Sequence, residues 1–595
     1  MRSPRDGQKR IDPERIAEIL HVVRSFAYEP TLVQAADDLI YWAAHAERRR
    51  SKYRAISIAI EIYNEYGRSN KSREVITGFL SEIEKEVEAT VSEMEQEPRR
   101  AMDILKQICW VYAGAAITHY WFQESEKGLG FIKRAREIID QHLTVKHGQL
   151  EGLPCFGTQS RLTYYAALLN LQMRDLKHAD ENLRSSLAFA ADRYAQLERE
   201  KRDNKNYWES TEGKREARYT NICVAKIQGF AAATIHESHG ELRMAQFLLE
   251  SAELVLRQSH SPTMAQMIRL RLCKVKRALA GRAVEKLDPI IREVKECHDA
   301  FSEHRKGDDS SVQNKFYASL SAFEIGLSSL YKAQGLRHTG QKDSPEYQEA
   351  LEEAEFYATR ITNSSESDYW SFSKQLLLCR IKRETDPPTS MKHADLALGI
   401  ARVLGRSALI VDAYIAMGEA LLQNSDYNEA LSVFELAERK NQSDSDNLDR
   451  IKAICSLRKA EAFVELDRKH EAVRMLDEWK VLSKQIEFEV IHYIARKVEN
   501  KLKDFVGDFH ISKEAEELDF KLQSERLKEW LAIVVLRRHE GKGDDLESDS
   551  KYAQWLMDEM RIGLSTAYKM LPKLLGHDWK KRLAARRAAK RTEAD

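Results

Sequence analysis

The chain has 595 residues, and its 94 lysines and arginines equal its 94 aspartates and glutamates, which excludes a polyelectrolyte character for the molecule as a whole. Only 25 glycines and 11 prolines interrupt a chain that is 43% hydrophobic, which favours long helices joined by short turns over disorder. This length also excludes one ordinary domain, unless the chain is a repeat array that adds core as it lengthens.

The seven cysteines are scattered singly and form no C-x-x-C pair, as expected in a reducing cytosol. The N-terminus carries charges but no apolar stretch of signal-peptide type, and no run of ~18 apolar residues predicts a membrane span. We therefore expect a soluble cytoplasmic protein with no membrane partner.

Residues 1–100 predict helical pairs without a clear repeat signature. From residue 101 to residue 485 one pattern recurs, in which a helix rich in small residues is followed by a turn and an amphipathic second helix. The segment "ICWVYAGAAITHYWFQESEKGLGFIKRAREII" places Ala115 and Ala116 in its first helix and Gly128 in its second. Further hairpins of this kind centre on Ala166 and Ala179, on residues 228–256, and on residues 412–442.

The most regular hairpin is "DAYIAMGEALLQNSDYNEALSVFELAERKNQ". Gly418 and Ala430 allow its two helices to approach closely, and Phe434 fills the space between them. This arrangement resembles the tetratricopeptide repeat, although Gln442 stands where that repeat usually ends in proline. The resemblance implies an all-α fold, a right-handed superhelical solenoid of helical hairpins whose first helices line a concave surface.

The repeats are degenerate. The alanines that open successive second helices, Ala350, Ala394, Ala430 and Ala472, follow one another at intervals of 44, 36 and 42 residues. These intervals exceed the 34 residues of the tetratricopeptide family. Longer helices or insertions are therefore expected, and the polar stretches at residues 199–221, 303–315 and 335–348 are the candidates.

Residues 486–539 predict the terminal helices of the array, including a long amphipathic helix at 512–539. The polar stretch at residues 540–551 then predicts a linker. It leads to a C-terminal segment, residues 552–595, that contains "SKYAQWLMDEM" and "RIGLSTAYKMLPKLLG". These two stretches resemble a helix-turn-helix, whose second helix enters the major groove of DNA.

Two residues of this segment depart from the usual pattern, since Arg561 replaces the turn glycine and Pro572 ends the second helix early. A similar early proline occurs in the tetracycline-repressor family. Residues 551–595 hold eleven lysines and arginines against five acidic residues, seven of the eleven in "KKRLAARRAAKR". Such a cluster pairs with phosphates. The candidate DNA-binding residues are Arg561, Ser565, Thr566, Tyr568, Lys569, Lys573, Lys580, Lys581 and Arg582.

The first helices of the predicted hairpins carry a set of aromatic residues that would face the concave surface. Aromatic clusters in such a surface anchor protein or peptide partners. The alternative is that several of these rings pack between neighbouring helices. The candidate partner-binding residues are Trp110, Tyr120, Trp121, Tyr164, Tyr165 and Phe230.

No common catalytic or nucleotide-binding motif is present, and no cofactor is predicted. His236 and His239 could share a helix face, but further metal ligands are missing. The sequence therefore predicts a non-enzymatic regulator that binds a protein or peptide and, through its C-terminus, double-stranded DNA. A lone helix-turn-helix usually needs a homodimer to reach useful affinity, although the sequence does not give the oligomeric state. It resembles bacterial regulators in which a repeat array senses a peptide. Two alternatives stay open: a protein-only scaffold whose C-terminal hairpin caps the array, and an accessory subunit whose tail touches nucleic acid held by a partner.

Overall fold

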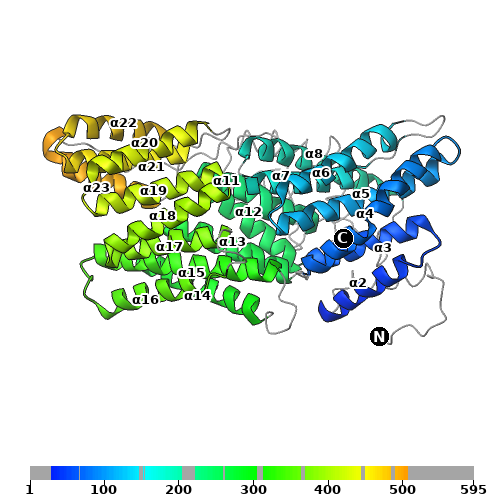
Figure 1. Cartoon of the computed structure of the whole chain (residues 1–595), viewed down its shortest axis with the longest axis horizontal. Helices are drawn as coiled ribbons and strands as arrows, with labels where there is room; N and C mark the ends of the chain where they lie inside the picture. Colours follow the sequence, from blue (N-terminus) through cyan, green and yellow to red (C-terminus); the bar gives the residue numbers. More distant parts are fainter. Residues whose placement is uncertain are drawn as a thin grey trace, which may run out of the picture. The chain divides into compact units, whose positions relative to one another are not determined.

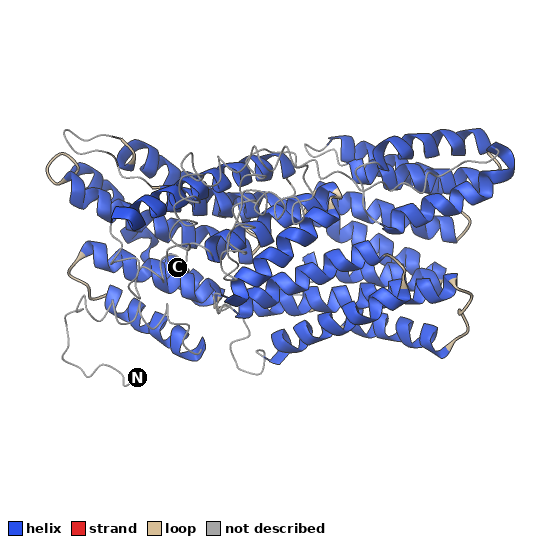
Figure 2. Ribbon diagram, turned by 180° about the vertical axis from the view of Figure 1, so that it is seen from behind, coloured by secondary structure: helices blue, strands red, loops and turns tan. Residues whose placement is uncertain are grey.

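In the computed structural model, the described residues are 29–65, 68–145, 152, 155–173, 175–203, 222–258, 262–303, 312–362, 369–443, 449–483 and 489–506. Twenty α-helices and two short π-helical segments make up nearly all of this part of the chain, which contains no strand (Figures 1 and 2). The predicted all-α class is confirmed for these residues.

The helices before residue 240 are α2 (Glu29–Ala43), α3 (Arg49–Glu65), α4 (Ser69–Ser92), α5 (Pro98–Trp121), α6 (Ser125–Ile138) with η1 (Ile139–Leu143), α7 (Phe156–Met173), α8 (Leu176–Asp203), and η2 (Ile227–Ala232) with α11 (Ala233–His239). The later helices are α12 (Leu242–Gln258), α13 (Pro262–Ala280), α14 (Val284–Glu303), α15 (Val312–His338), α16 (Pro345–Thr359), α17 (Tyr369–Thr385), α18 (Pro387–Val403), α19 (Ser407–Gln423), α20 (Tyr427–Ser443), α21 (Asp449–Glu465), α22 (Lys469–Ser483) and α23 (Glu489–Val506).

The chain divides into two units of contacting residues. The first comprises Met1–Leu183 and Asn204–Phe509, and the second comprises Arg184–Asp203 and His510–Asp595. All described residues except the last part of α8 belong to the first unit. The predicted linker and helix-turn-helix, residues 540–595, lie outside the described residues.

Within the first unit, consecutive helices pack as adjacent pairs (Figure 1). The first helix of a pair also packs against the first helix of the next pair, as α13, α15, α17, α19, α21 and α23 do in turn, and as α3, α5 and α7 do earlier. We call these helices, together with η2 and α11, the first-helix layer. This layer positions the candidate site.

The pairs pack closely where the sequence places its small residues. Ala430 and Phe434 of α20 are fully buried, and a Cβ built on Gly418 of α19 would lie 2.6 Å from Cε1 of Phe434. A Cβ on Gly128 of α6 would similarly lie 2.8 Å from Leu169 of α7. The close approach predicted for the hairpin of α19 and α20 is therefore confirmed, and α6 approaches α7 similarly closely at Gly128.

The predicted insertions differ in outcome. Most of residues 335–348 is helical, because α15 continues to His338 and α16 begins at Pro345. The Ser344 hydroxyl caps α16 by accepting from the backbone N–H of Tyr347, and Pro345 occupies the first helical position. The insertion at residues 199–221 begins as helix, because α8 continues to Asp203. The insertion at residues 303–315 is helical at both ends, because α14 ends at Glu303 and α15 begins at Val312. The remaining residues of these two insertions lie outside the described part.

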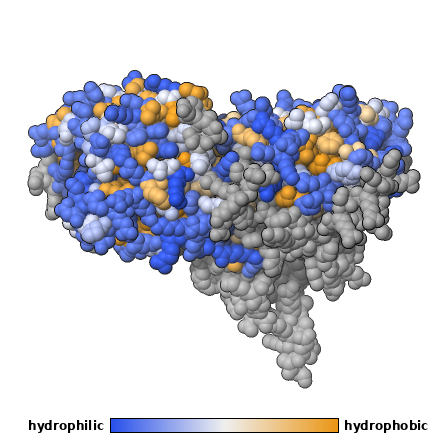
Figure 3. Space-filling view, turned by 60° about the horizontal axis from the view of Figure 1, so that its bottom comes forward, coloured by the Kyte–Doolittle hydropathy of each residue, from blue (hydrophilic) through white to orange (hydrophobic). Residues whose placement is uncertain are grey.

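The face shown in Figure 3 is mostly hydrophilic, with apolar residues in separate groups. Among the described residues, the most exposed large apolar side chains on second helices of pairs are Phe356, Leu396, Val403, Leu436 and Val481. No described helix is both long enough and apolar enough to cross a membrane.

Candidate functional site

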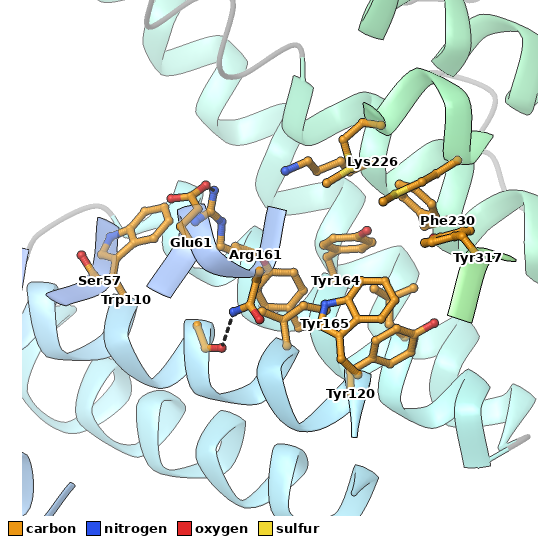
Figure 4. A pocket seen from close by; sticks show the side chains of 17 residues that line it. Ser57, Glu61, Trp110, Tyr120, Arg161, Tyr164, Tyr165, Lys226, Phe230 and Tyr317 are labelled. Carbon is orange, nitrogen blue, oxygen red and sulfur yellow. Dashed lines mark hydrogen bonds and ion pairs between the residues drawn. The ribbon is translucent and has the colours of Figure 1, made fainter. Parts of the chain in front are cut away.

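A pocket opens on the first-helix layer where several pairs meet (Figure 4). It is lined by residues of α3, α5, α7, α13 and α15. Phe230 of η2 and Lys226, the residue directly before η2, also line it. The space open to the centres of water-sized molecules is about 60 Å³. At roughly 10–15 Å³ for each water, this space holds several non-hydrogen atoms. The lining residues are Ser57, Glu61, Asn64, Trp110, Gly114, Ile117, Tyr120, Trp121, Arg161, Tyr164, Tyr165, Leu168, Lys226, Phe230, Met264, Met267 and Tyr317.

The pocket brings together all six aromatic residues that the sequence marked as partner-binding candidates. Tyr164 and Phe230 are buried, with 6% and 7% of their surface exposed, so they form the wall as packed core residues do. The other four, Trp110, Tyr120, Trp121 and Tyr165, are half-buried. Tyr164 and Phe230 therefore fit the alternative that the rings pack between neighbouring helices. The other four rings keep exposed surface that a ligand can contact.

The rings contact one another along the pocket. The ring centroids of Tyr164 and Tyr165 are 5.2 Å apart, and those of Tyr120 and Trp121 are 5.1 Å apart in an edge-to-face arrangement. Trp121 in turn lies 6.1 Å from Tyr317 of α15. Because these distances suit favourable aromatic pairs, each ring is held in place before any ligand arrives.

An ion pair forms one end of the pocket (Figure 4). Arg161 of α7 donates to the Glu61 carboxylate of α3 over 2.9 Å, and only 9% of the arginine side chain is exposed. The guanidinium also lies 4.3 Å from the centroid of the Trp110 ring. Arg161 thereby fixes the position of Trp110 through a cation–π contact.

A second arginine supports the opposite end, where Figure 4 shows Phe230 and Tyr317. Arg271 of α13 lies 5.0 Å from the Phe230 ring centroid and donates through Nη1 to the Thr234 hydroxyl over 2.7 Å. Burial alone would lower the pKa of Arg271, but the Tyr317 and Tyr120 hydroxyls and further nearby groups outweigh burial and raise that pKa. Arg271 therefore stays charged.

A hydrogen-bond network fixes the α3 side of the pocket to α5. The Asn64 amide donates to the Thr118 hydroxyl over 2.9 Å and to the Gly114 carbonyl over 3.3 Å. The Ser72 hydroxyl of α4 completes the network 2.6 Å from Thr118. These buried bonds join three helices, so the α3 and α5 walls keep a fixed spacing.

Sequence reasoning missed the polar groups and one ring of this site. Tyr317 follows a polar stretch without repeat signature, and Arg161, Lys226 and Arg271 resemble ordinary helix-surface charges in the sequence. The signal that could have found Arg161 is its spacing, because it stands four residues before Tyr165 and so on the same face of the helix as that candidate.

The nine candidate DNA-binding residues, from Arg561 to Arg582, all lie outside the described residues. His236, one of the two histidines weighed as metal ligands, contacts the Glu241 carboxylate through Nδ1. In the described part of the chain, no group of three or more His, Cys, Asp or Glu side chains could hold a metal ion.

No protein-family model and no curated protein matches the chain.

Proposed function

We propose that this chain is a non-enzymatic protein of tetratricopeptide-like hairpins, wound as a right-handed superhelix, that binds a segment of a protein or peptide partner in the pocket of the first-helix layer. One observation carries the proposal: six aromatic residues from three separate first helices converge on a single pocket, and four of them keep exposed surface. Rigid aromatic side chains around a desolvated hollow are typical of binding hot spots.

The size of the pocket favours a side chain over a large cofactor. Its free space holds several atoms, which suits the end of one large apolar side chain. Met264 and Met267 add flexible apolar surface that adapts to different shapes. The rest of a bound segment would then lie along neighbouring first helices.

The second part of the proposal concerns the C-terminus and rests on sequence alone. Residues 551–595 combine the helix-turn-helix resemblance with an excess of six positive charges. We propose that this segment binds double-stranded DNA as a dimer and that partner binding to the array regulates it. In the scaffold alternative, the same segment would bind protein only.

The test of partner binding starts with selection from a random peptide library on the full-length chain. The affinity of an enriched peptide would then be compared for the unchanged protein, Tyr165→Ala and Tyr41→Ala, by fluorescence anisotropy. Tyr41 is the matched control, because its ring is 53% exposed on α2 and it is not among the pocket-lining residues. We expect Tyr165→Ala to weaken binding by about tenfold or more, as loss of a hot-spot aromatic does.

Equal affinities for the Tyr165→Ala and Tyr41→Ala variants would contradict the proposed site.

DNA binding is tested separately, with a mixed-sequence duplex and the full chain at two salt concentrations. The triple variant Thr566→Ala, Tyr568→Ala, Lys569→Ala should lose the salt-sensitive binding. If it binds as well as the unchanged chain, groove reading by this segment is wrong.

A further inference from the structure

Helix α18 carries an exposed stripe of apolar residues. Leu396 and Val403 are 54% and 72% exposed, among the highest values for apolar side chains in the described part of the chain. Ile400 is half-buried beside them, and a Cβ built on Gly399 would meet no atom within 4 Å. An open hollow follows this stripe, and it is lined by Lys392, Asp395, Leu396, Gly399, Ile400 and Val403.

The stripe is not the face by which α18 packs within the chain. Ala397 and Ala401 of this helix are fully buried in a core cluster with residues of α17 and α19. Leu396, Gly399 and Val403 follow one another at intervals of three and four residues, which is the spacing of a helix face that packs against another helix. Helix α18 therefore has a second apolar face, which the rest of the chain leaves exposed.

Two opposite charges flank the stripe on one edge. Asp395 and Arg402 are both exposed, and neither side chain forms an ion pair or a hydrogen bond with the described residues. They stand seven residues apart, so they lie on the same edge of the stripe, about 10 Å from each other along the helix. When two such helices pack antiparallel, each Asp395 faces the Arg402 of the other copy. The edge is therefore complementary to itself.

We propose that a second copy of this chain docks on this face, with the two α18 helices antiparallel about a two-fold axis. Leu396 and Val403 of each copy pack into the hollow of the other, and two ion pairs between Asp395 and Arg402 fix the direction. Parallel helices would instead set the charged edge against the edge of Ile400 and leave both charges unpaired. A two-fold contact closes on itself, so it gives dimers and not filaments.

The contact area of this dimer is small, because each copy contributes mainly one helix. We therefore expect a dissociation constant of roughly 10 µM. The inference goes beyond the proposed function, since it assigns the surface by which two copies meet. The dimer would bring two C-terminal segments into one assembly, as DNA binding by a helix-turn-helix usually requires. It does not depend on DNA binding, because the dimer is measured without DNA.

Sedimentation equilibrium of the full-length chain tests the contact, at protein concentrations from about 1 µM to about 100 µM. We expect the unchanged chain to pass from monomer to dimer over this range. Asp395→Arg and Arg402→Asp each place like charges at both contacts, so each should raise the dissociation constant by about tenfold or more. Leu396→Ser should also weaken the dimer, because it removes apolar surface from the contact.

A mixture of the two charge variants gives the sharpest test. Equimolar Asp395→Arg and Arg402→Asp chains should form a heterodimer, because every contact again joins an arginine to an aspartate. The chain that carries both substitutions should dimerise with itself for the same reason. The control is Glu352→Arg, which reverses an exposed carboxylate of α16 that has no ion pair with the described residues, and it should leave the dimer unchanged. All the substituted side chains are exposed, so the variants should unfold at the same temperature as the unchanged chain.

Three results would overturn the inference. The first is an unchanged chain that stays monomeric at every concentration. The second is a dimer that neither charge reversal weakens, since the two copies would then meet through another surface. The third is a mixture of the two charge variants that stays monomeric. If the unchanged chain dimerises through α18 but does not bind the duplex, only the DNA-binding proposal fails.

Discussion

Arg458 of α21 donates through Nε to the Glu419 carboxylate of α19 over 2.9 Å, and Arg383 of α17 binds the other oxygen of the same carboxylate. The three side chains are each 13% exposed. Arg458 also pairs with Glu461 at 2.8 Å, and Glu461 with Lys497 of α23 at 2.6 Å. Ion pairs therefore connect four successive first helices, which stabilises the stacking of one pair on the next.

Glu419→Gln should destabilise the protein strongly, because two largely buried arginines would lose their shared counter-charge. Removing one partner of a buried ion pair costs about 3–5 kcal/mol. The matched control is Glu435→Gln on α20, whose carboxylate is 60% exposed and lies 4.0 Å from Arg439, so about 0–1 kcal/mol is expected there. Urea denaturation of the three proteins measures the difference, and similar midpoints for both variants would contradict it.

Acid should weaken the same contacts. Burial raises the pKa of Glu461, but Arg458 and Lys497 outweigh it and lower that pKa from 4.5 to about 2. Because the folded-state pKa is depressed, the stabilisation is present above pH 4.5 and is lost as the pH falls toward 2. The pKa of Glu419 is lowered in the same direction by Arg383 and Arg458 despite its burial.

The urea midpoints of the unchanged chain and of Glu461→Gln are measured from about pH 6 down to about pH 3, a range that includes the ordinary pKa of a carboxyl group. The unchanged chain should lose stability more steeply, because the variant has no Glu461 carboxylate to protonate. Protonation of Glu499 has the opposite effect on stability. Burial raises the pKa of this carboxyl, so its protonation at low pH favours the folded state. Parallel curves for the two proteins would show that Glu461 does not carry the acid sensitivity.

Helix packing gives a prediction with a matched glycine. Gly418→Ala places a Cβ within 2.6 and 2.7 Å of Phe434, and such overpacking costs about 1–3 kcal/mol. Gly399→Ala on α18 meets no atom within 4 Å, so it should stabilise the helix by about 0.5–1 kcal/mol. Thermal unfolding should therefore shift in opposite directions. Phe434→Leu combined with Gly418→Ala should cost less than the sum of the two single changes.

The repeat pattern predicted the local parts of this fold well. Gly418, Ala430 and Phe434 lie within one hairpin, so helical periodicity was enough to place them against one another. Trp110 and Tyr165 were assigned to first helices for the same reason, and the pocket contains both. Their role in binding stays a prediction.

The polar interactions could not be predicted, because each joins helices far apart in the sequence. Arg161 meets Glu61 across 100 residues, and Arg458 meets Glu419 across 39. Charged residues on amphipathic helices look alike in a sequence whether they face solvent or a neighbouring repeat. Only the register between neighbouring helix pairs decides this, and the irregular intervals between the pairs conceal that register.

A final prediction concerns the buried pair of Arg277 on α13 and Glu324 on α15. Nε of Arg277 donates to Oε2 of Glu324 over 2.9 Å, with only 8% and 1% of the two side chains exposed, and Oε1 of Glu324 has no partner among the described residues. Arg277→Met alone would leave a buried carboxylate without its counter-charge, at a cost of about 3–5 kcal/mol.

Arg277→Met combined with Glu324→Leu should be less destabilised than Arg277→Met alone, because the second change removes the charge that the first left unpaired. A double-mutant cycle by urea denaturation measures this coupling. If the double variant is instead the least stable of the set, the pair contributes more through its attraction than its burial costs. That outcome would contradict the expectation that an unpaired, buried Glu324 carboxylate costs more than the loss of the whole pair between α13 and α15.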